Sequence, residues 1–479
     1  MAGPAFLEKK NTFARPGYSK WLIPPAALCV HLSIGQVYAF SVFKTSLVQR
    51  FESSQTAVAW IFSIAIVMLG LSAAVLGTWV ERNGPRKAMV AAAACWGTGF
   101  LVGSAGIAIG SLPLLYLGYG VIGGIGLGIG YISPVSTLIK WFPDKPGLAT
   151  GMAIMGFGGG ALIASPLSNL LMGIYDPQFD PANSGTGASG TGASASALAL
   201  TFLTLGLVYL FFMLVGAALI RLPQGFGDDA TAAHQPGRGG ALVRAKAAIR
   251  TPQFALLWVV LFCNVTAGIG ILEQAAPMIQ DFFRDGEDSS VSAAEAAGFV
   301  GMLSLANMAG RFIWSSASDR IGRKPIYMMY LGVGLVLYIL LATFGQTSPA
   351  VFVVLALLII SYYGGGFATV PAYLKDLFGT LEVGAIHGRL LTAWAAAGVV
   401  GPLIVNGFLD AAGEPGSLVA EDYHPALITM VVVLGVGFVA NLLVKPVAEK
   451  HFDAEAVRTH HGRETTDTAG EPATTGGTR

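Results

Sequence analysis

Twelve stretches of mostly apolar residues recur along this 479-residue chain. A helix needs about 20 such residues to cross the hydrocarbon core of a bilayer, and each stretch reaches that length. Only 11% of the residues are charged, against about 25% in soluble domains. The pattern predicts an all-α integral membrane protein with twelve transmembrane helices, and it argues against a soluble enzyme, a nucleic-acid binder, a disordered chain or a coiled coil. The predicted spans are 21–43, 57–80, 88–109, 112–139, 148–172, 197–220, 253–280, 293–317, 325–345, 350–374, 388–409 and 425–444.

The basic residues lie almost entirely on one side of these spans. If the N-terminus is cytoplasmic, 24 of the 28 Lys and Arg residues fall on the cytoplasmic side, whereas Lys44, Arg50 and Arg284 fall outside. Cytoplasmic loops of membrane proteins carry such an excess. We therefore expect a multi-pass protein of the cell (plasma) membrane with both termini in the cytoplasm. The first apolar run is long enough to span and follows about 20 residues of polar character, so no cleaved signal peptide is expected.

The two halves of the chain resemble each other at a nearly constant offset. Glu81 corresponds to Asp319, and Pro134 corresponds to Pro371 at almost the same separation along the sequence. Transporters built from two parallel repeats place their substrate site between the repeats. We therefore expect two six-helix pseudo-repeats in the same orientation, with a site between them.

Five segments follow from these spans. They are a cytoplasmic N-terminal arm (1–20), an N-terminal six-helix half (21–220), a cytoplasmic middle loop (221–252), a C-terminal six-helix half (253–445) and a cytoplasmic, disordered tail (446–479). The tail is predicted to be disordered because it is polar and rich in Thr. Residues 183–196 are uncharged and of low complexity, and we expect a flexible outer loop there without an assigned function.

Two corresponding polar loops follow the second and eighth spans. The later one, SSASDRIGRK at 315–324, resembles the signature loop G-x-x-x-D-R-x-G-R-K of the major facilitator superfamily, except that Ser315 replaces the first glycine. The earlier one, GTWVERNGPRK at 77–87, departs further, with Glu81 for the aspartate and Pro85 after the second glycine. An acid at a helix end can face a neighbouring helix N-terminus and nearby Arg, which would hold a cytoplasmic gate shut. The alternative is that these charges only set the topology. The candidate gating residues are Glu81, Arg82, Arg86, Asp319, Arg320 and Arg323.

Further stretches resemble the oxalate:formate antiporter family and the related monocarboxylate transporters. They extend over the first eleven spans and comprise GQVYAFSVF (35–43), ERNGPRK (81–87), GYISPVSTLIKWFPDKPGLATG (130–151), NMAGRFIWSSASDRIGRKP (307–325) and HGRLLTAWAAAG (387–398). The resemblance implies the major facilitator fold and a transporter, not an enzyme.

Arg311 is the one Lys or Arg that is fully embedded in a predicted span, since Arg389 lies at the cytoplasmic end of its span. It precedes Asp319 by eight residues, which places it about 12 Å inside the helix end, and Asn307 lies one turn earlier on the same face. A charge at this depth is costly and marks a functional site by default. We expect the guanidinium to bind a carboxylate bidentately, through two parallel hydrogen bonds. The resemblance implies the same role, because the matching Arg of the family contacts substrate. The alternative is a structural pair with a carbonyl group or a carboxylate.

Other polar residues reach a similar depth in spans 1, 4, 7 and 10, which line the cavity in this superfamily. Tyr hydroxyls can donate to a carboxylate, and a His can carry a proton. For each residue the alternative is a side chain that only packs. These candidates are His31, Tyr131, Asn264, Tyr362 and Tyr363. A further histidine, His387, is expected in a cytoplasmic loop.

Trp394 lies near the depth of Arg311, about 8 Å inside its span. The oxalate exchangers of the family place a Lys at this position, and two cations can hold oxalate by both ends. With Arg311 as the one fixed cation, a second carboxylate would be buried without a partner, which costs several kcal/mol. We therefore expect a monocarboxylate substrate beside Trp394. The alternatives are that a protonated His31 supplies the second charge, or that Trp394 only packs between helices.

These observations predict a secondary transporter that takes up a monocarboxylate such as lactate or pyruvate together with a proton, by alternating access. The same-class alternative is oxalate/formate exchange, and the alternative from another class is a transporter-like nutrient sensor. The sequence shows no metal-ligand cluster, catalytic triad or phosphate-binding loop, so we expect no cofactor, no metal and no nucleic acid. The predicted partners are a small organic anion, a proton and the lipid bilayer, for a monomeric protein.

Overall fold

The computed structural model describes residues 5–179, 192–224, 236, 240–285, 288–291, 293–413 and 418–458. The regular secondary structure of this part of the chain is helical, apart from two-residue strands, β1 (Arg284–Asp285) and β2 (Asp288–Ser289), which pair antiparallel, and an isolated bridge between Phe13 and Leu222. Residues 459–479 of the predicted tail and 180–191, which include most of the predicted 183–196 loop, lie outside the described residues.

The N-terminal half consists of six long helical units. Two of them are composite: α1 continues into the 3-10 helix η4 and then α2, and α5 continues through the π-helical η5 into α6. Their bounds are α1 (Ile23–Ile34), η4 (Gly35–Phe43), α2 (Lys44–Phe51), α3 (Gln55–Asn83), α4 (Pro85–Ile109), α5 (Leu112–Leu115), η5 (Tyr116–Gly123), α6 (Gly124–Trp141), α7 (Pro146–Tyr175) and α8 (Ala195–Leu219).

The C-terminal half repeats this arrangement after a short helix in the middle segment, α9 (Ala245–Ala248). Its long helices are α10 (Pro252–Phe282), α11 (Ala293–Ile321), α12 (Arg323–Phe344), α13 (Pro349–Phe378), α14 (Val383–Ala412) and α15 (His424–Leu443). Short 3-10 helices lie at Ala5–Leu7, Lys9–Thr12, Lys20–Leu22, Gly345–Thr347, Ala420–Tyr423 and Glu449–His451. The fourth units of the halves, α6 and α13, each contain an interior proline, Pro134 and Pro371.

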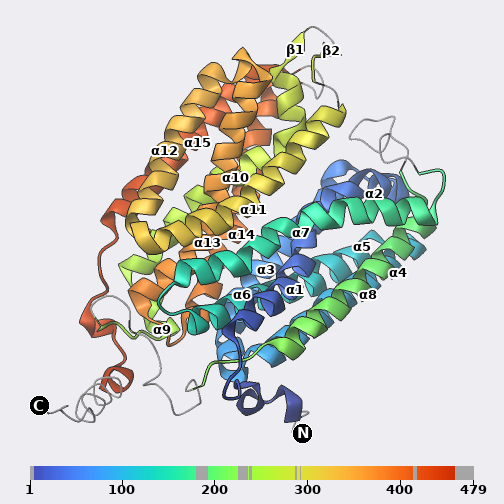
Figure 1. The fold of residues 1–479 in the computed structure, drawn as a ribbon. Coiled ribbons are helices and arrows are strands. Elements are labelled where there is room, and N and C mark those ends of the chain that lie inside the picture. Colours follow the sequence, from blue (N-terminus) through green and yellow to red (C-terminus); the bar gives the residue numbers. More distant parts are fainter. Residues whose placement is uncertain are drawn as a thin grey trace, which may run out of the picture.

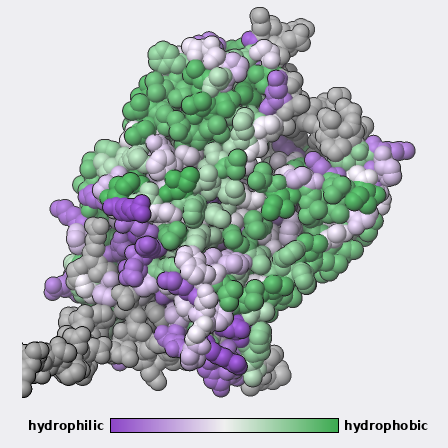
Figure 2. Space-filling view, viewed as in Figure 1, coloured by the Kyte–Doolittle hydropathy of each residue, from purple (hydrophilic) through white to green (hydrophobic). Residues whose placement is uncertain are grey.

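Eleven of the helices in the described chain are long and apolar enough to cross a membrane. The 29-residue α11 stands beside them as the twelfth span. Large apolar side chains, such as Val75 and Leu403, are exposed on the outer faces of the helices. Figure 2 shows this apolar surface over both bundles, with the polar side chains gathered at the end where the termini lie. The prediction of an all-α membrane protein with two six-helix halves is confirmed.

The two halves form separate bundles that meet at the end carrying both chain termini, here called the terminal side (Figure 1). Contacts between α3 and α14 and between α7 and α11 join them. At this end the backbones touch: a Cβ on Gly147 would lie 2.1 Å from the carbonyl oxygen of Ser315. Towards the opposite end the two bundles diverge (Figure 1). The molecule is therefore closed on the terminal side and splayed on the other.

The start of the predicted disordered tail is structured. Residues Glu449–His451 form a 3-10 helix, and Asp453 N donates to the carbonyl of Leu242 at 2.8 Å. Ala456 packs with Leu242 and Leu381 in a small apolar cluster. This packing orders residues up to 458 against the middle segment, so the expectation of disorder from residue 446 does not describe 446–458.

Candidate functional site

Arg311 lies on α11 between the two halves and is fully buried. Its Nε donates to Asn307 Oδ1 at 3.0 Å, one turn earlier on the same helix. Its Nη1 donates across the interface to the carbonyl of Ile154 on α7 at 3.3 Å, while Nη2 has no hydrogen-bond partner among the described residues. No carboxylate in the described chain pairs with this guanidinium. A buried guanidinium without an anionic partner is costly. The arrangement therefore indicates that an anion would complete the site.

Three aromatic rings from different helices surround the guanidinium. Its carbon lies 5.0 Å from the ring centre of Phe367 on α13, 5.7 Å from Phe157 on α7 and 6.0 Å from Tyr38 in η4. Ring faces attract a cation within about 6 Å, so these contacts hold the charge without neutralising it. The sequence analysis did not single out any of the three rings, because apolar residues inside apolar spans give no separate signal.

Two further donors without partners lie beside the same rings. Trp394 packs at 5.2 Å from Phe367 and 5.9 Å from Phe157, and Tyr131 packs at 5.4 Å from Phe157. The Trp394 Nε1 and the Tyr131 hydroxyl are buried without hydrogen-bond partners among the described residues. Native proteins rarely leave buried donors unmet. Three unmet donors, counting Arg311 Nη2, suit the oxygens of a carboxylate.

His31 contacts the site through Tyr131. The two rings stack at 5.4 Å, and both nitrogens of His31 face carbonyl oxygens: Nδ1 lies 2.5 Å from Ala153 O, and Nε2 lies 3.1 Å from Tyr131 O. A neutral imidazole has one N–H and can donate to only one of these acceptors, whereas an imidazolium can donate to both. The surroundings of His31 thus include the acceptors that a protonated ring needs.

The remaining candidates divide between the site and its periphery. The Tyr363 hydroxyl lies 3.5 Å from that of Tyr38 and so joins the two halves over Arg311. Asn264 on α10 packs against Gly366, where a Cβ would lie 2.5 Å from its Oδ1. Tyr362 is turned elsewhere, with its ring 5.3 Å from Trp314.

His387 lies inside α14, not in a loop as expected. Helix α14 begins at Val383, so His387 is already in its second turn. Its ring is buried 5.7 Å from that of Tyr131, and neither nitrogen has a hydrogen-bond partner among the described residues. The sequence held one usable signal, since His387 precedes Trp394 by seven residues and so shares its helix face.

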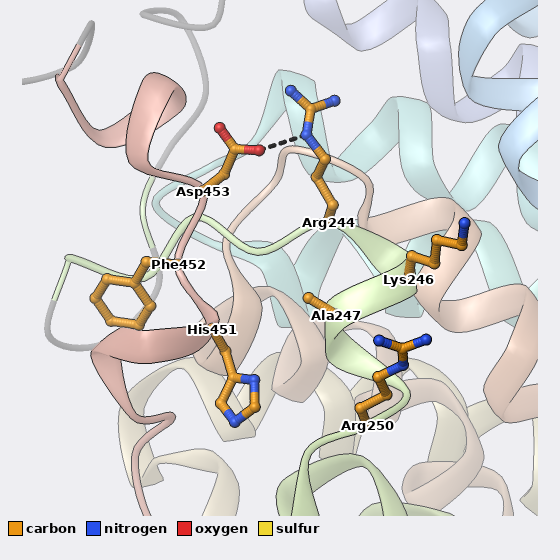
Figure 3. Close-up of a pocket in the computed structure, with 7 residues that line it drawn as sticks. All are labelled: Arg244, Lys246, Ala247, Arg250, His451, Phe452 and Asp453. Atoms are coloured by element: carbon orange, nitrogen blue, oxygen red, sulfur yellow. Dashed lines mark hydrogen bonds and ion pairs between the residues drawn. The ribbon is translucent and has the colours of Figure 1, made fainter.

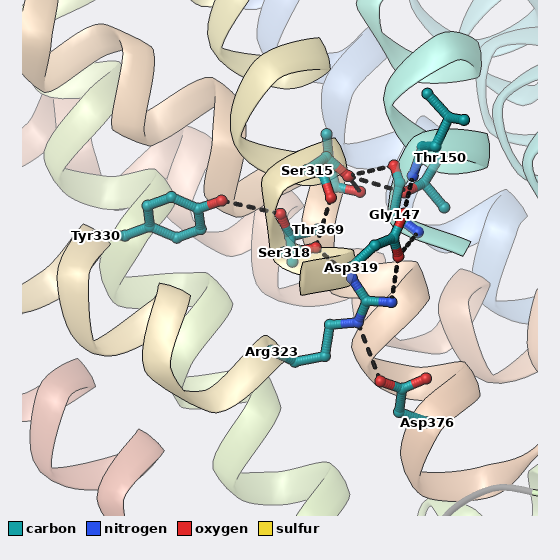
Figure 4. A network of polar contacts seen from close by, with 11 residues as sticks. Gly147, Thr150, Ser315, Ser318, Asp319, Arg323, Tyr330, Thr369 and Asp376 are labelled. Atoms are coloured by element: carbon teal, nitrogen blue, oxygen red, sulfur yellow. Dashed lines mark hydrogen bonds and ion pairs between the residues drawn. The ribbon is translucent and has the colours of Figure 1, made fainter. Parts of the chain in front are cut away.

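Asp319 joins the halves on the terminal side, and we call its contacts the Asp319 latch (Figure 4). Its carboxylate accepts hydrogen bonds from the backbone N–H groups of Gly147 and Leu148, both at 2.8 Å, in the first turn of α7. Arg323 donates to the same carboxylate at 2.6 Å and also to Asp376 at 3.0 Å. An acid is stabilised at a helix N-terminus by the unpaired N–H groups and the helix dipole.

Glu81 makes the corresponding contact from the other half, here called the Glu81 latch. It accepts from Gly384 N at 3.1 Å in the first turn of α14, and from Lys140 at 2.5 Å. Because α14 in the second half corresponds to α7 in the first, the two latches are related by the repeat.

The other three candidate gating residues lie apart from these latches. Arg86 donates to the carbonyls of Phe6 and Asn11 in the N-terminal arm. Arg82 and Arg320 are exposed, and no hydrogen bond or ion pair joins their side chains to the described chain. Of the six candidate gating residues, only Glu81 and Asp319 form hydrogen bonds with the opposite half of the described chain, because each lies at the start of a helix in that bundle.

A model of the Major Facilitator Superfamily matches residues 26–402 and, in an overlapping match, residues 286–467. The chain belongs to this superfamily, whose members are membrane transporters and not enzymes. It is 25% identical to the oxalate:formate antiporter of Oxalobacter formigenes over 78% of this chain and 81% of that protein. It is also 24% identical to the apicoplast pyruvate carrier 1 of Toxoplasma gondii, over 75% and 70% of the two chains. The resemblance stated from the motifs is thus confirmed.

Solved structures show the same fold. The transporter FucP of E. coli, crystallised in an outward conformation, aligns with a TM-score of 0.65 at 15% identity, over 90% of this chain and all of that one. The likeness confirms the major facilitator fold for this chain.

Proposed function

We propose that the protein is a secondary transporter that takes up a small monocarboxylate with a proton, by alternating access. The observation that carries this proposal is Arg311, a buried guanidinium between the halves with no carboxylate partner in the described chain. The relatives named for oxalate, formate and pyruvate support a small organic anion. Saturable uptake of labelled lactate or pyruvate by proteoliposomes that contain the purified protein is the direct test.

The terminal side is proposed to face the cytoplasm of a cell (plasma) membrane. The sequence-based topology assigns 24 of the 28 Lys and Arg residues to the cytoplasmic side, and the positive-inside rule supports this orientation. In this orientation the structure is closed to the cytoplasm and splayed towards the outside. The protein is proposed to act as a monomer, with the arm, middle loop and tail on the cytoplasmic face.

The Asp319 and Glu81 latches are proposed to hold the cytoplasmic gate shut. Each places a carboxylate from one half on a helix N-terminus of the other. Rocking the halves apart on the cytoplasmic side must break both contacts. Arg323 supports the Asp319 carboxylate from within its own half.

We predict that Asp319→Asn opens the cytoplasmic gate more often. An amide loses the charge that the helix N-terminus favours, and charge-assisted hydrogen bonds are worth about 1.5–3 kcal/mol, so opening should increase at least about tenfold. Thr150 is fully buried behind the latch. In a background without the three native cysteines, a Thr150→Cys thiol should react with a maleimide about tenfold faster when Asp319 is replaced.

Arg320→Gln is the matched control for this measurement. It removes a neighbouring, exposed charge that forms no hydrogen bond or ion pair with the described chain, so labelling should stay within about twofold of the parent. An unchanged rate in Asp319→Asn would exclude the latch as a determinant of gating.

The proposed coupling of uptake to one proton leads to a second prediction. Bringing one anion against an inside-negative potential costs about 2.3 kcal/mol per 100 mV, and one accompanying proton cancels this term. Uptake should therefore increase with an inward proton gradient and stay unchanged when valinomycin and potassium impose a potential at fixed pH. A strong response to the imposed potential would favour charge-moving exchange, as in an oxalate/formate antiporter.

His31 and His387 are the two candidate proton carriers. His31 faces two carbonyl acceptors, which would stabilise its imidazolium form. His387 also packs against Tyr131, and its two nitrogens have no hydrogen-bond partners in the described chain. The hydrogen bonds around His31 make it the leading candidate, and loss of the response to the proton gradient in His31→Gln but not in His387→Gln would support that choice.

A further inference from the structure

A second basic site lies on the terminal side, away from the gap between the halves. A cavity of about 280 Å³ opens there between the middle segment and the C-terminal segment. Figure 3 shows the side chains around it. The middle segment contributes Arg244, Lys246 and Arg250, and the C-terminal segment contributes His451, Phe452 and Asp453.

Specific contacts hold the two segments together around this cavity. The side chain of Arg244 forms an ion pair with Asp453 through its Nε. Glu382, in the loop before α14, accepts from Ala245 N at 2.8 Å at the start of α9. The cavity walls are thus fixed by tertiary contacts, although the whole C-terminal helical half separates the two segments in the sequence.

The charges that line the cavity are unbalanced. Asp453 is the one acidic side chain among them, against three fixed cations and His451. Its bond to Arg244 uses Nε and leaves the two Nη groups of that guanidinium without partners in the described chain. The side chains of Lys246 and Arg250 are exposed and form no hydrogen bond or ion pair with described residues. Three cations line one opening that has a single acidic side chain, and Glu382 and Glu455 act on Arg244 alone. Lys246 and Arg250 therefore remain to attract an anionic ligand.

The cavity lies where a membrane-spanning helix begins. Arg250 precedes α10 by two residues, and Gln253, in the first turn of α10, donates to Pro446 O at 2.9 Å in the C-terminal segment. The neighbouring Ile249 is 42% exposed. An exposed apolar residue beside unpaired cations suits the level of lipid headgroups, where basic pockets bind anionic lipids.

We propose that this cavity binds a phosphate-bearing anion. The guanidinium groups of Arg244 and Arg250 match phosphate oxygens bidentately, Lys246 adds a point charge, and Phe452 offers an apolar wall. A lipid headgroup and a soluble phosphate share this chemistry. The proposal concerns a site separate from Arg311 and stands whether or not the transported substrate is a monocarboxylate.

The test uses the purified full-length protein and measures binding by thermophoresis. The probes are dihexanoyl-phosphatidylglycerol, dihexanoyl-phosphatidylcholine as the uncharged-headgroup control, and inorganic phosphate. We expect phosphatidylglycerol to bind, and the Lys246→Gln/Arg250→Gln double variant to bind it at least tenfold more weakly. The matched control is Lys445→Gln/Lys450→Gln, which removes the same charge from exposed residues that do not line the cavity, and it should stay within twofold of the wild type.

The Asp453→Asn variant tests whether the charge of the cavity lining controls anion binding while the two segments stay folded. It removes the competing negative charge, while the amide oxygen can still accept from Arg244 Nε and keep the two segments together, so anion binding should persist or tighten. If inorganic phosphate binds with the same dependence on Lys246 and Arg250 and displaces the lipid, the ligand is a soluble phosphate. If it does not, the ligand is the lipid headgroup. Equal binding of all probes by the wild type and the Lys246→Gln/Arg250→Gln variant would overturn the proposal.

Discussion

Arg311→Ala is expected to abolish saturable uptake while the protein still reaches the membrane. The guanidinium is the fixed cation of the site, and truncating one partner of a buried charge pair costs about 2–5 kcal/mol. At 1.4 kcal/mol per decade, this corresponds to a loss of about 30-fold to several thousandfold in apparent affinity. The measurement is initial uptake of labelled lactate or pyruvate by proteoliposomes.

The same variant should not lower the stability of the empty protein. Arg311 is buried without a carboxylate in the described chain. Its removal therefore takes away a charge whose desolvation is offset only in part by two hydrogen bonds and three ring contacts. Thermal unfolding without substrate should therefore begin no earlier in Arg311→Ala than in the wild type. This combination separates a binding role from a structural one, because the loss of a structural pair would lower both uptake and stability.

Arg311→Lys tests the shape of the cation. A lysine keeps the charge but loses the planar fork, together with the Nε contact to Asn307. We expect uptake well below wild type but above that of Arg311→Ala. Substantial saturable uptake by the Ala variant would remove Arg311 from the substrate site.

Excess oxalate should compete poorly with labelled lactate or pyruvate at pH 7.5. In the described part of the site Arg311 is the one fixed cation, and Trp394 stands where the resemblance to the oxalate exchangers implies a lysine. A second carboxylate would be buried without a partner at a cost of several kcal/mol, which is about a thousandfold discrimination. Potent inhibition by oxalate at this pH would contradict the one-cation argument.

Trp394→Lys is the matching gain-of-function variant. Trp394 lies 5.2 Å from Phe367, which also contacts the guanidinium of Arg311, so a lysine there would face the same space. Inhibition by oxalate should become strong in this variant, and uptake of the monocarboxylate should fall. Oxalate binding that stays weak would show that Trp394 packs without selecting the substrate.

The pH dependence of the same competition examines His31. If the protonated imidazole supplies a second positive charge, oxalate inhibition of the wild type should strengthen from pH 7.5 to pH 5. The His31→Gln variant should not show this change. Inhibition that is equally weak from pH 5 to pH 7.5 in the wild type would exclude His31 as the second cation.

The local sequence determined the membrane spans, the repeat and the position of the central cation. The spans and the cation depend on properties that act over a few turns of helix, namely apolar length and the cost of one charge inside an apolar stretch. The repeat is visible because matching motifs recur at a nearly constant offset. The sequence also predicted that Asn307 lies beside Arg311, since residues four apart share a helix face.

Only the tertiary structure decided which side chains surround Arg311. Phe157, Phe367 and Tyr38 come from three helices and resemble any other ring in an apolar span until the bundles pack. His387 was missed because the start of α14 depends on contacts across the gate, where Gly384 meets Glu81. The order in residues 446–458 likewise depends on the middle segment, because Asp453 is held by Arg244 and Leu242. A polar tail does not fold on its own. Here the middle segment, which is distant in the sequence, provides the contacts that order it.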